Sequence, residues 1–553
     1  MKKKNVIIKE ERIKEYLSPV RIAAASPNVI NAEALLGAFE KQNFFKVNSL
    51  CKVRGKGYII LDYGREIYGS ARIQTNRYYD MKDGNNFRIR FGESLSETCS
   101  EPGVKGAGND HSVRDFSFYM SSNSDMEWGN TGFRFIRIDF LLDQTYTINK
   151  IAAGYTHTDA VQKGSFSTSL RGDNVKRIYD TAAYTLFLNM QNLVWDGIKR
   201  DQHLWVGDLY PELTGIFFAF GNVKILRESL EGLLAHYKMP VWYNEIPAYN
   251  IWFLLCANDF VKYSGEEIPG LSDAVLENLK LFSVCAGKNG ELDFDKAHCE
   301  YWCDDFFEWP CKDTPYGKTG VYFLLKYALL KLAEEKFFGE EITDNAKALL
   351  SRLTLDPPFT GIKSIEALRA LTSDDECVKK ETARFLKRGG AKGCSIFLIY
   401  FILKALAENG EGAAAMSVLR EYYGGMLDKG ATTFWENFDI EWCKGSCRID
   451  EFPKENEKDI HGDFGAHCYQ GFRHSLCHGW SSGAIAFLAE CVAGVRVTGK
   501  GFSKIRFAPV PGIDEPFECR VPTPYGEIFV RRVFTGEEYR TECVVPKGIE
   551  TRN

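Results

Sequence analysis

The chain has 553 residues, of which 45% are hydrophobic, 26% charged and 14% aromatic. This length exceeds the roughly 250–300 residues at which a single hydrophobic core stops growing, so we expect two or three domains. The formal net charge is −5 and no long basic stripe occurs along the chain, which argues against nucleic acid as a partner.

The apolar segments are too short for export or membrane insertion. The first apolar run spans only residues 6–8, which is too short for a secretory signal. The longest run, residues 396–403, is far below the roughly 18 residues that a membrane span requires. We therefore expect a cytoplasmic protein without a membrane partner.

The sixteen cysteines are best explained as reduced thiols, because a large chain without an export signal seldom relies on disulfides. Cys299, Cys303 and Cys311 are ligand-type residues, but their C-x3-C-x7-C spacing lacks the paired C-x2-C of structural zinc sites. Cys443 and Cys447 repeat the C-x3-C spacing, which is one helical turn. We expect no bound metal.

Residues 57–142 alternate apolar and polar side chains between turn residues. In the stretch FIRID, Ile136 and Ile138 share one face and Arg137 lies on the other, as in a half-buried strand. This pattern predicts an antiparallel β-sandwich, which we assign to an N-terminal domain of residues 1–163.

From about residue 173 the apolar spacing becomes helical, as in VKILRESLEGLLAHY and SIFLIYFILKALAENG. Roughly a dozen such helices fit this stretch, which favours a paired-helix architecture. We assign residues 164–494 to a helical domain. From residue 495, short alternating segments such as EIFVRRVF lie between Pro and Gly turns, and they predict a small β domain over 495–553.

Loops of the helical domain combine acidic and aromatic side chains: WDGIKRDQHLWVGD (195–208), YWCDDFFEWP (301–310), GATTFWENFD (430–439) and HSLCHGWSSG (474–483). Sugars present apolar C–H faces and a rim of hydroxyls, so sugar sites combine aromatic walls with carboxylates. Cleavage of a glycosidic bond also needs two carboxyl groups, one to protonate the leaving oxygen and one to activate water or attack the ring. The loops therefore predict a sugar site.

Each candidate residue also has a structural explanation. A loop aspartate such as Asp196, Asp201 or Asp208 most often serves solvation or helix capping. Three of them close to Trp195 and Trp205 favour a site instead. The other candidates also have structural explanations. Glu436 could be a solvated glutamate, Trp309 a core residue and His478 a histidine at a helix start.

Several phrases follow one another in a recognisable order. LDYGREIYGSARI and FRIRFGESLSE precede FSTSLRGDNVKRIYDTAAYTLFLNM, and then come IPAYNIWFLL, FFEWP, GATTFWENFD, SLCHGWSSGA and GFSKIRFAP. Together they resemble the α-L-rhamnosidases of glycoside hydrolase family 78 over nearly the whole chain. The resemblance implies a multidomain protein with an (α/α)6 barrel catalytic domain, flanked by an N-terminal antiparallel β-sandwich and a small C-terminal β domain. It also implies hydrolysis of terminal α-L-rhamnose with inversion.

The family's acidic loop has the pattern D-x-x-x-R-D-E-R-L-G-W-T-G-D, in which the glutamate is the general acid. The present loop is D-G-I-K-R-D-Q-H-L-W-V-G-D, one residue shorter. Alignment on its first aspartate and its arginine places Gln202 at the acid position, and an amide cannot supply a proton. Alignment on the WVGD end places Asp201 there. We favour Asp201, because the loop then keeps a carboxyl group at this position.

The resemblance implies that Glu436 is the general base. Inversion needs room for a water molecule, so the carboxyl groups of Asp201 and Glu436 should lie about 6.5–9.5 Å apart. By the same resemblance, Asp196 and Asp208 hold sugar hydroxyls, Trp309 forms an aromatic wall and His478 contacts the sugar. The full set that we assign to substrate binding is Asp196, Arg200, Gln202, Trp205, Asp208, Trp309 and His478.

These observations predict an exo-acting, inverting α-L-rhamnosidase that acts on small glycosides and needs no metal or organic cofactor. One alternative, motivated by Gln202, is a degenerate relative that binds sugar without hydrolysis. Another is an (α/α)6 enzyme with a different reaction, such as a phosphorylase or an unsaturated-uronide hydrolase. The uronide reaction needs a basic patch, which the loops supply only through Lys199, Arg200 and His203. The sequence leaves a homodimer open.

Overall fold

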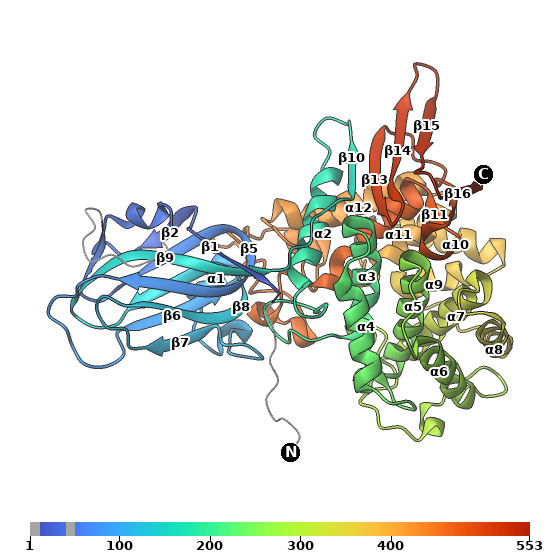
Figure 1. Cartoon of the computed structure of the whole chain (residues 1–553), viewed down its shortest axis with the longest axis horizontal. Helices are drawn as coiled ribbons and strands as arrows, with labels where there is room; N and C mark the ends of the chain where they lie inside the picture. The colour runs from blue at the N-terminus through green and yellow to red at the C-terminus, as the bar shows by residue number, and fades with distance from the viewer. Residues whose placement is uncertain (1–10, 40–49, 553) are drawn as a thin grey trace.

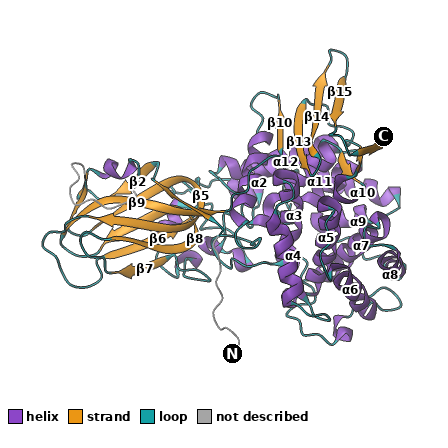
Figure 2. Cartoon of the chain, viewed as in Figure 1, coloured by secondary structure: helices purple, strands orange, loops and turns teal. Residues whose placement is uncertain are grey.

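The computed structural model describes residues 11–39 and 50–552, so the apolar residues 6–8 lie outside the described residues. An N-terminal β module lies at one end of an elongated molecule, and a helix-rich region with a smaller set of strands lies at the other (Figure 1). Figure 2 shows the same division by secondary structure, with strands gathered at the two flanks of the helices. The predicted multidomain layout is confirmed in this coarse form.

The N-terminal module is one antiparallel sheet in the described part of the chain. Its main path runs β3-β4-β9-β5-β8-β6-β7, with β1 beside β9 and β2 beside β5. The first half of β5 pairs with β2 and β8, whereas its second half pairs with β8 and β9. The strands are β1 (Ile13–Leu17), β2 (Arg21–Ala25), β3 (Val29–Ile30), β4 (Cys51–Arg54), β5 (Gly57–Thr75), β6 (Phe87–Gly92), β7 (Asp115–Phe118), β8 (Asp125–Phe140) and β9 (Thr145–His157).

The alternation predicted from FIRID is present in β8. Ile136 and Ile138 are fully buried in the core of the module, opposite Leu61 and Ile59 of β5. Arg137 points to the other face, where its guanidinium lies over the ring of Tyr58. The short helix α1 (Leu95–Cys99) packs against β6 and β8.

The helix-rich region contains fully buried helices and several helices that keep a solvent face. Every residue of α3 and α5 is buried, whereas α4, α6, α8 and α10 each have exposed residues along one side. A helix that is apolar all round belongs in an interior, and an amphipathic one belongs at a surface. The helices are α2 (Val175–Asn189), α3 (Val206–Phe220), α4 (Lys224–His236), α5 (Pro247–Ser264), α6 (Leu271–Cys285), α7 (Gly317–Glu335), α8 (Glu340–Leu350), α9 (Lys363–Leu371), α10 (Glu376–Lys387), α11 (Ile399–Glu408), α12 (Gly412–Asp428) and α13 (Gly483–Ala486).

Local sequence determines where the buried helices begin and end. α5 begins with Pro247, whose missing N–H is not needed in the first turn, and it ends before Gly265, which has φ 72°. α3 begins directly after the loop 195–205, so that Asp208 lies in its first turn. The positions of these helix ends fix where the acidic loop meets the rest of the helical region.

The C-terminal strands form two small sheets. The first residues of the stretch 164–494, which we assigned to the helical domain, form β10 (Ser165–Thr168), and this strand pairs with β13 of the C-terminal sheet. The chain therefore passes through the C-terminal sheet before it enters the helices. The remaining strands are β11 (Val495–Val497), β12 (Lys504–Phe507), β13 (Phe517–Thr523), β14 (Gly526–Phe534), β15 (Tyr539–Val544) and β16 (Glu550–Arg552).

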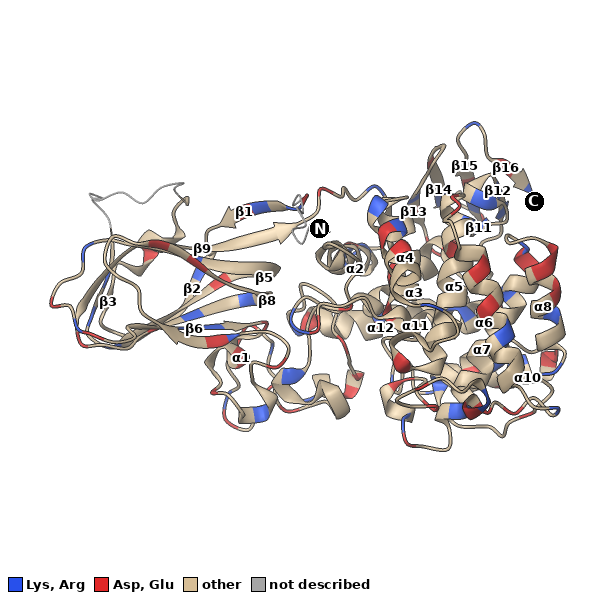
Figure 3. Cartoon of the chain, turned by 60° about the horizontal axis from the view of Figure 1, so that its bottom comes forward, with Lys and Arg blue, Asp and Glu red and all other residues tan. Residues whose placement is uncertain are grey.

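The charged residues and the cysteines are arranged as their composition indicates. Basic and acidic residues are interspersed over the ribbon in Figure 3. All sixteen cysteines are free thiols, as predicted. Within residues 11–39 and 50–552, no helix is both long and apolar enough to cross a membrane.

We expect Leu213→Ala to destabilise the helical region. Leu213 is fully buried in α3, and the loss of its side chain leaves a cavity that typically costs about 2–5 kcal/mol. Chemical unfolding followed by far-ultraviolet circular dichroism measures the change. The same substitution at Leu170, which is 43% exposed, should shift the midpoint little. Equal shifts for both variants would contradict the placement of α3 in the interior.

Candidate active site

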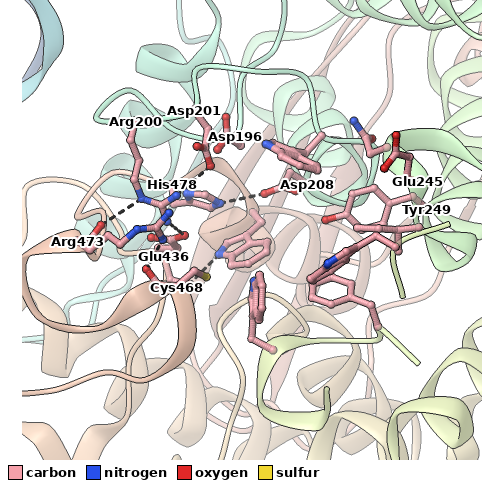
Figure 4. A pocket seen from close by; sticks show the side chains of 17 residues that line it. Asp196, Arg200, Asp201, Asp208, Glu245, Tyr249, Glu436, Cys468, Arg473 and His478 are labelled. Atoms are coloured by element: carbon pink, nitrogen blue, oxygen red, sulfur yellow. Dashed lines mark hydrogen bonds and ion pairs between the residues drawn. The ribbon is translucent and has the colours of Figure 1, made fainter. Parts of the chain in front are cut away.

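The four acid-and-aromatic loops meet at one cavity of about 360 Å³ (Figure 4). The cavity is lined by Asp196, Arg200, Asp201, Trp205, Asp208, Asn244, Glu245, Ile246, Tyr249, Trp302, Phe306, Trp309, Glu436, Cys468, Arg473, His478 and Trp480. Of the residues predicted from the sequence to form the site, only Gln202 is missing from this lining. The volume suits one sugar ring and the first atoms of whatever the ring is attached to.

Glu436 is buried at the cavity wall and is held on several sides. Its backbone N–H donates to the carbonyl of Ser475 at 2.9 Å, and the Ser475 N–H donates to its Oε2 at 3.0 Å. The indole N–H of Trp480 donates to its carbonyl oxygen at 2.9 Å. Burial alone would raise the pKa of Glu436, but the charge of Arg200, assisted by the nearby histidines, lowers it to about 2. The side chain is therefore an ionised carboxylate.

Arg200 joins Glu436 to Asp201. One terminal nitrogen of its guanidinium forms an ion pair with Glu436, and the other lies 2.9 Å from Oδ2 of Asp201. The two carboxyl groups are thus separated by the width of one guanidinium group. In Figure 4 they lie on the side of the cavity opposite Tyr249 and Glu245. Arg200 also donates its Nε to the carbonyl of Arg473 at 3.1 Å, which fixes the plane of the group.

Asp201 and Gln202 point in different directions because the backbone reverses between them. Both have positive φ, 59° and 56°, which is uncommon for residues other than glycine. The side chain of Asp201 reaches the cavity. The Gln202 amide instead donates to the carbonyls of Asn130 at 3.1 Å and Ile198 at 3.0 Å. Gln202 therefore binds the loop to the β module and does not contribute to the cavity.

Asp196, Asp208 and His478 lie together at another part of the wall. Nε2 of His478 lies 2.9 Å from Oδ1 of Asp208. Burial would lower the pKa of His478, but the hydrogen bond with Asp208 raises it above its usual value. Asp196 accepts a hydrogen bond from the backbone N–H of His203 at 3.0 Å. Burial raises the pKa of Asp196 to about 7, so that this carboxyl group is partly protonated near neutrality.

Aromatic side chains form the rest of the wall. Trp302, Phe306 and Trp309 pack on one another with ring centroids 5.2–5.9 Å apart. The ring of Trp205 meets Tyr249 edge to face. Trp302 is 52% exposed, whereas the others are largely covered. Flat apolar surfaces of this kind match the C–H faces of a sugar.

Trp195, which we expected beside the aspartates, lies elsewhere. It packs edge to face on Tyr68 at 5.2 Å and belongs to the hydrophobic core of the β module. The neighbouring side chain of Asp196 lines the cavity, so the two side chains face opposite ways. Trp195 anchors the acidic loop and does not form a wall of the cavity.

The β module contributes residues that the sequence analysis did not find. Glu93, buried at the end of β6, accepts a hydrogen bond from the N–H of Leu476 at 2.7 Å. Lys199 lies 3.2 Å from Glu93 and 2.8 Å from Glu97, and it donates to the carbonyls of Phe472 and His474. This buried network holds the loop whose Ser475 binds Glu436. It also occupies the ammonium group of Lys199, which therefore adds no basic charge to the cavity.

Other lining residues lie within phrases already noted. Trp302 and Phe306 belong to YWCDDFFEWP, Tyr249 to IPAYNIWFLL and Trp480 to HSLCHGWSSG, so their loops were found although the residues were not selected. Glu245, Cys468 and Arg473 also line the cavity, but they lie outside the sequence phrases that indicated the site.

The overall structure is similar to solved α-L-rhamnosidases. The glycoside hydrolase family 78 rhamnosidase of Bacillus sp. GL1 aligns with a TM-score of 0.69 and 18% identity, over 94% of this chain and 56% of that chain. The α-L-rhamnosidase from Dictyoglumus thermophilum gives 0.68 and 16%, over 98% and 59%. A rhamnosidase from Klebsiella oxytoca, solved with rhamnose bound, gives 0.63 and 17%, over 87% and 96%.

The resemblance inferred from the sequence is thereby confirmed at the level of the fold. The chain spans a little more than half the length of the first two of these proteins. No protein-family model and no curated protein matches the sequence.

The raised pKa of Asp196 predicts a stability that depends on pH. The pKa is about 7 in the folded chain against 3.8 for a free aspartate, so the folded state holds an extra proton between these values and loses stability as the pH rises through them. Asp196→Asn cannot ionise and keeps an oxygen for the His203 N–H. We expect the variant to exceed the wild type by about 2–4 kcal/mol at pH 8 and by clearly less at pH 5.

Urea unfolding at the two pH values measures this difference. The exposed Asp374→Asn is the matched control and should show no such trend. A gain for Asp196→Asn that is the same at pH 5 and pH 8 would contradict a carboxyl group with a raised pKa.

Proposed function

We propose that the protein is an exo-acting, inverting glycoside hydrolase of the α-L-rhamnosidase type, with a small glycoside as substrate. The observation that carries the proposal is the pair Asp201 and Glu436, linked by Arg200 across a cavity of the size of one sugar with aromatic walls. The similarity in fold to solved α-L-rhamnosidases, one of them with rhamnose bound, supports this class of substrate.

We infer an (α/α)6 barrel for the helical region. The alternation along the chain supports it, because the buried helices α3 and α5 are followed in turn by the partly exposed α4 and α6. Pairs of consecutive helices also pack together, as α7 does with α8 and α11 with α12. In such a barrel the inner helices surround the core, and the loops at one end form the pocket.

Glu436 suits the role of general base. It remains ionised at neutral pH, as a group that takes a proton from water must. Asp201 is the proton donor in this proposal, and its turn brings it to the same cavity. Asp196, Asp208 and His478 bind ring hydroxyls, and Trp309 and its neighbours cover the apolar face of the sugar.

In this proposal the reaction inverts the configuration of the sugar. A water molecule bound by Glu436 attacks the anomeric carbon while Asp201 protonates the oxygen that departs on the other face of the ring. No covalent intermediate forms, so the configuration at that carbon is reversed.

The two alternatives based on Gln202 and on a uronide have less support. Asp201 lines the cavity, whereas Gln202 binds backbone carbonyls outside it. The cavity-lining arginines, Arg200 and Arg473, are each already paired with a carboxylate. A sugar carboxylate would therefore have to compete for both.

Glu436→Gln should reduce the hydrolysis of 4-nitrophenyl α-L-rhamnoside by about 100-fold or more, because an amide cannot accept the proton of the attacking water. Release of nitrophenol gives the rate, and proton NMR of the wild-type reaction should show the β anomer first. The exposed Glu455→Gln is the control and should retain full activity. A fully active Glu436→Gln, or the α anomer as first product, would contradict the mechanism.

Gln202→Glu should bring no gain in activity, although it restores the residue type of the family pattern. Its carboxylate would face the carbonyls of Asn130 and Ile198, and the lost hydrogen bonds typically cost about 1–3 kcal/mol. Assays of both variants, Gln202→Glu and Asp201→Asn, decide between the two alignments. A faster Gln202→Glu enzyme would show that the side chain at 202 reaches the substrate.

A further inference from the structure

His111, a residue of the β module, contacts the side chain that the proposed reaction uses as its acid. Its Nδ1 forms a hydrogen-bonded ion pair with Oδ1 of Asp201. Its Nε2 lies 3.3 Å from Oδ1 of Asp110. Asp110 in turn forms an ion pair with Arg473, which lines the cavity. The segment before β7 therefore contacts two residues that line the cavity, Asp201 and Arg473.

The two partners differ in their access to water. The side chain of His111 is 54% exposed, whereas that of Asp201 is only 13% exposed. A proton can therefore be exchanged between solvent and the imidazole, while Asp201 is largely covered. His111 connects the covered carboxyl group to the solvent.

Arg200 creates a difficulty that His111 resolves. A carboxyl group beside a guanidinium favours its ionised form, yet a general acid must deliver a proton. A histidine is the side chain whose ordinary titration range lies around neutral pH. An imidazolium that shares a hydrogen bond with Asp201 keeps the required proton next to the carboxylate.

We propose that His111 stores the proton that Asp201 delivers to the departing oxygen. The inference rests on the proposed function, in which Asp201 is the general acid. His111 does not line the cavity, so it acts through Asp201 as a positioning and proton-supplying residue.

The reaction moves two protons. The Nδ1–H bond of His111 breaks and passes its proton to the carboxylate of Asp201, which leaves a neutral imidazole. The glycosidic C–O bond breaks, and its electron pair takes that proton from Asp201, which is a carboxylate again. The attacking water gives its hydroxyl to the anomeric carbon and its proton to Glu436. Solvent then protonates His111 again, and Glu436 releases its proton to solvent.

The charges around His111 are paired. Asp110 and Asp201 face its two ring nitrogens, and Arg473 and Arg200 lie behind these two carboxylates. The imidazole thus lies between two negative groups whose own partners are positive.

The test uses His111→Gly in the full chain. His111 has φ 60°, a conformation that glycine adopts without strain, so the loop should keep its course and leave a space for free imidazole. Two substrates are compared: 4-nitrophenyl α-L-rhamnoside, whose leaving group departs without a proton, and methyl α-L-rhamnoside, whose leaving group needs one.

We expect His111→Gly to stay within about threefold of the wild type on the nitrophenyl substrate and to lose about 100-fold or more on the methyl substrate. Added imidazole should restore the second rate, and the alkaline limb of the restored activity should move when a methylimidazole of different pKa replaces imidazole. His111→Gln retains a donor for Asp201 but holds no exchangeable charge, so it should resemble His111→Gly without imidazole. The exposed His236→Ala is the control.

Equal losses on both substrates without rescue would overturn the inference in favour of a structural role, and so would an unchanged rate on the methyl substrate. A wild-type protein that hydrolyses neither substrate would instead overturn the proposed function itself.

Discussion

The interaction on which the site depends is the buried guanidinium of Arg200 between Asp201 and Glu436. Two carboxylates this close repel each other, and burial makes the repulsion stronger because little water screens it. The guanidinium offsets both charges at once and, as a planar fork, also fixes the direction in which each carboxylate points. The side chain of Arg200 therefore fixes the position of the loop 195–205 relative to the segment that carries Glu436.

The β module is part of this site and not an appendage to it. Glu93 and Lys199 hold the backbone that positions Glu436, while His111 and Asp110 contact Asp201 and Arg473. These contacts are ionic or involve buried backbone groups, so they require the module to keep one orientation against the helices. Separation of the two parts would leave buried charges without partners, which is costly. Trp195 packs into the core of the module, and this apolar contact also holds the module in its orientation.

The sequence was sufficient for the parts of the site that depend on residue type and order. Residue type located the acid-and-aromatic loops, and the resemblance to the rhamnosidase family selected Glu436, which lines the cavity. The choice between Asp201 and Gln202 could not be made in the same way, since it depends on the sign of φ at two adjacent residues. His111 was missed because 90 positions separate it from Asp201 in the chain, and only the packing of the β module brings them together. Trp195 was misplaced for a related reason, because sequence proximity does not show which way a turn directs a side chain.

In the proposed function, the remaining polar wall of the cavity bears on how similar sugars are distinguished. The hydrogen bond with Asp208 raises the pKa of His478, so this pair holds a proton between its two side chains more firmly than a free imidazole would. Asp196, with a pKa of about 7, can offer either a donor or an acceptor to a hydroxyl group. In the proposed function, a sugar hydroxyl bound by Asp196 selects one protonation state of this carboxyl group, and the sugar bears the cost of reaching that state. Discrimination between similar sugars would then depend in part on the protonation of a single buried carboxyl group.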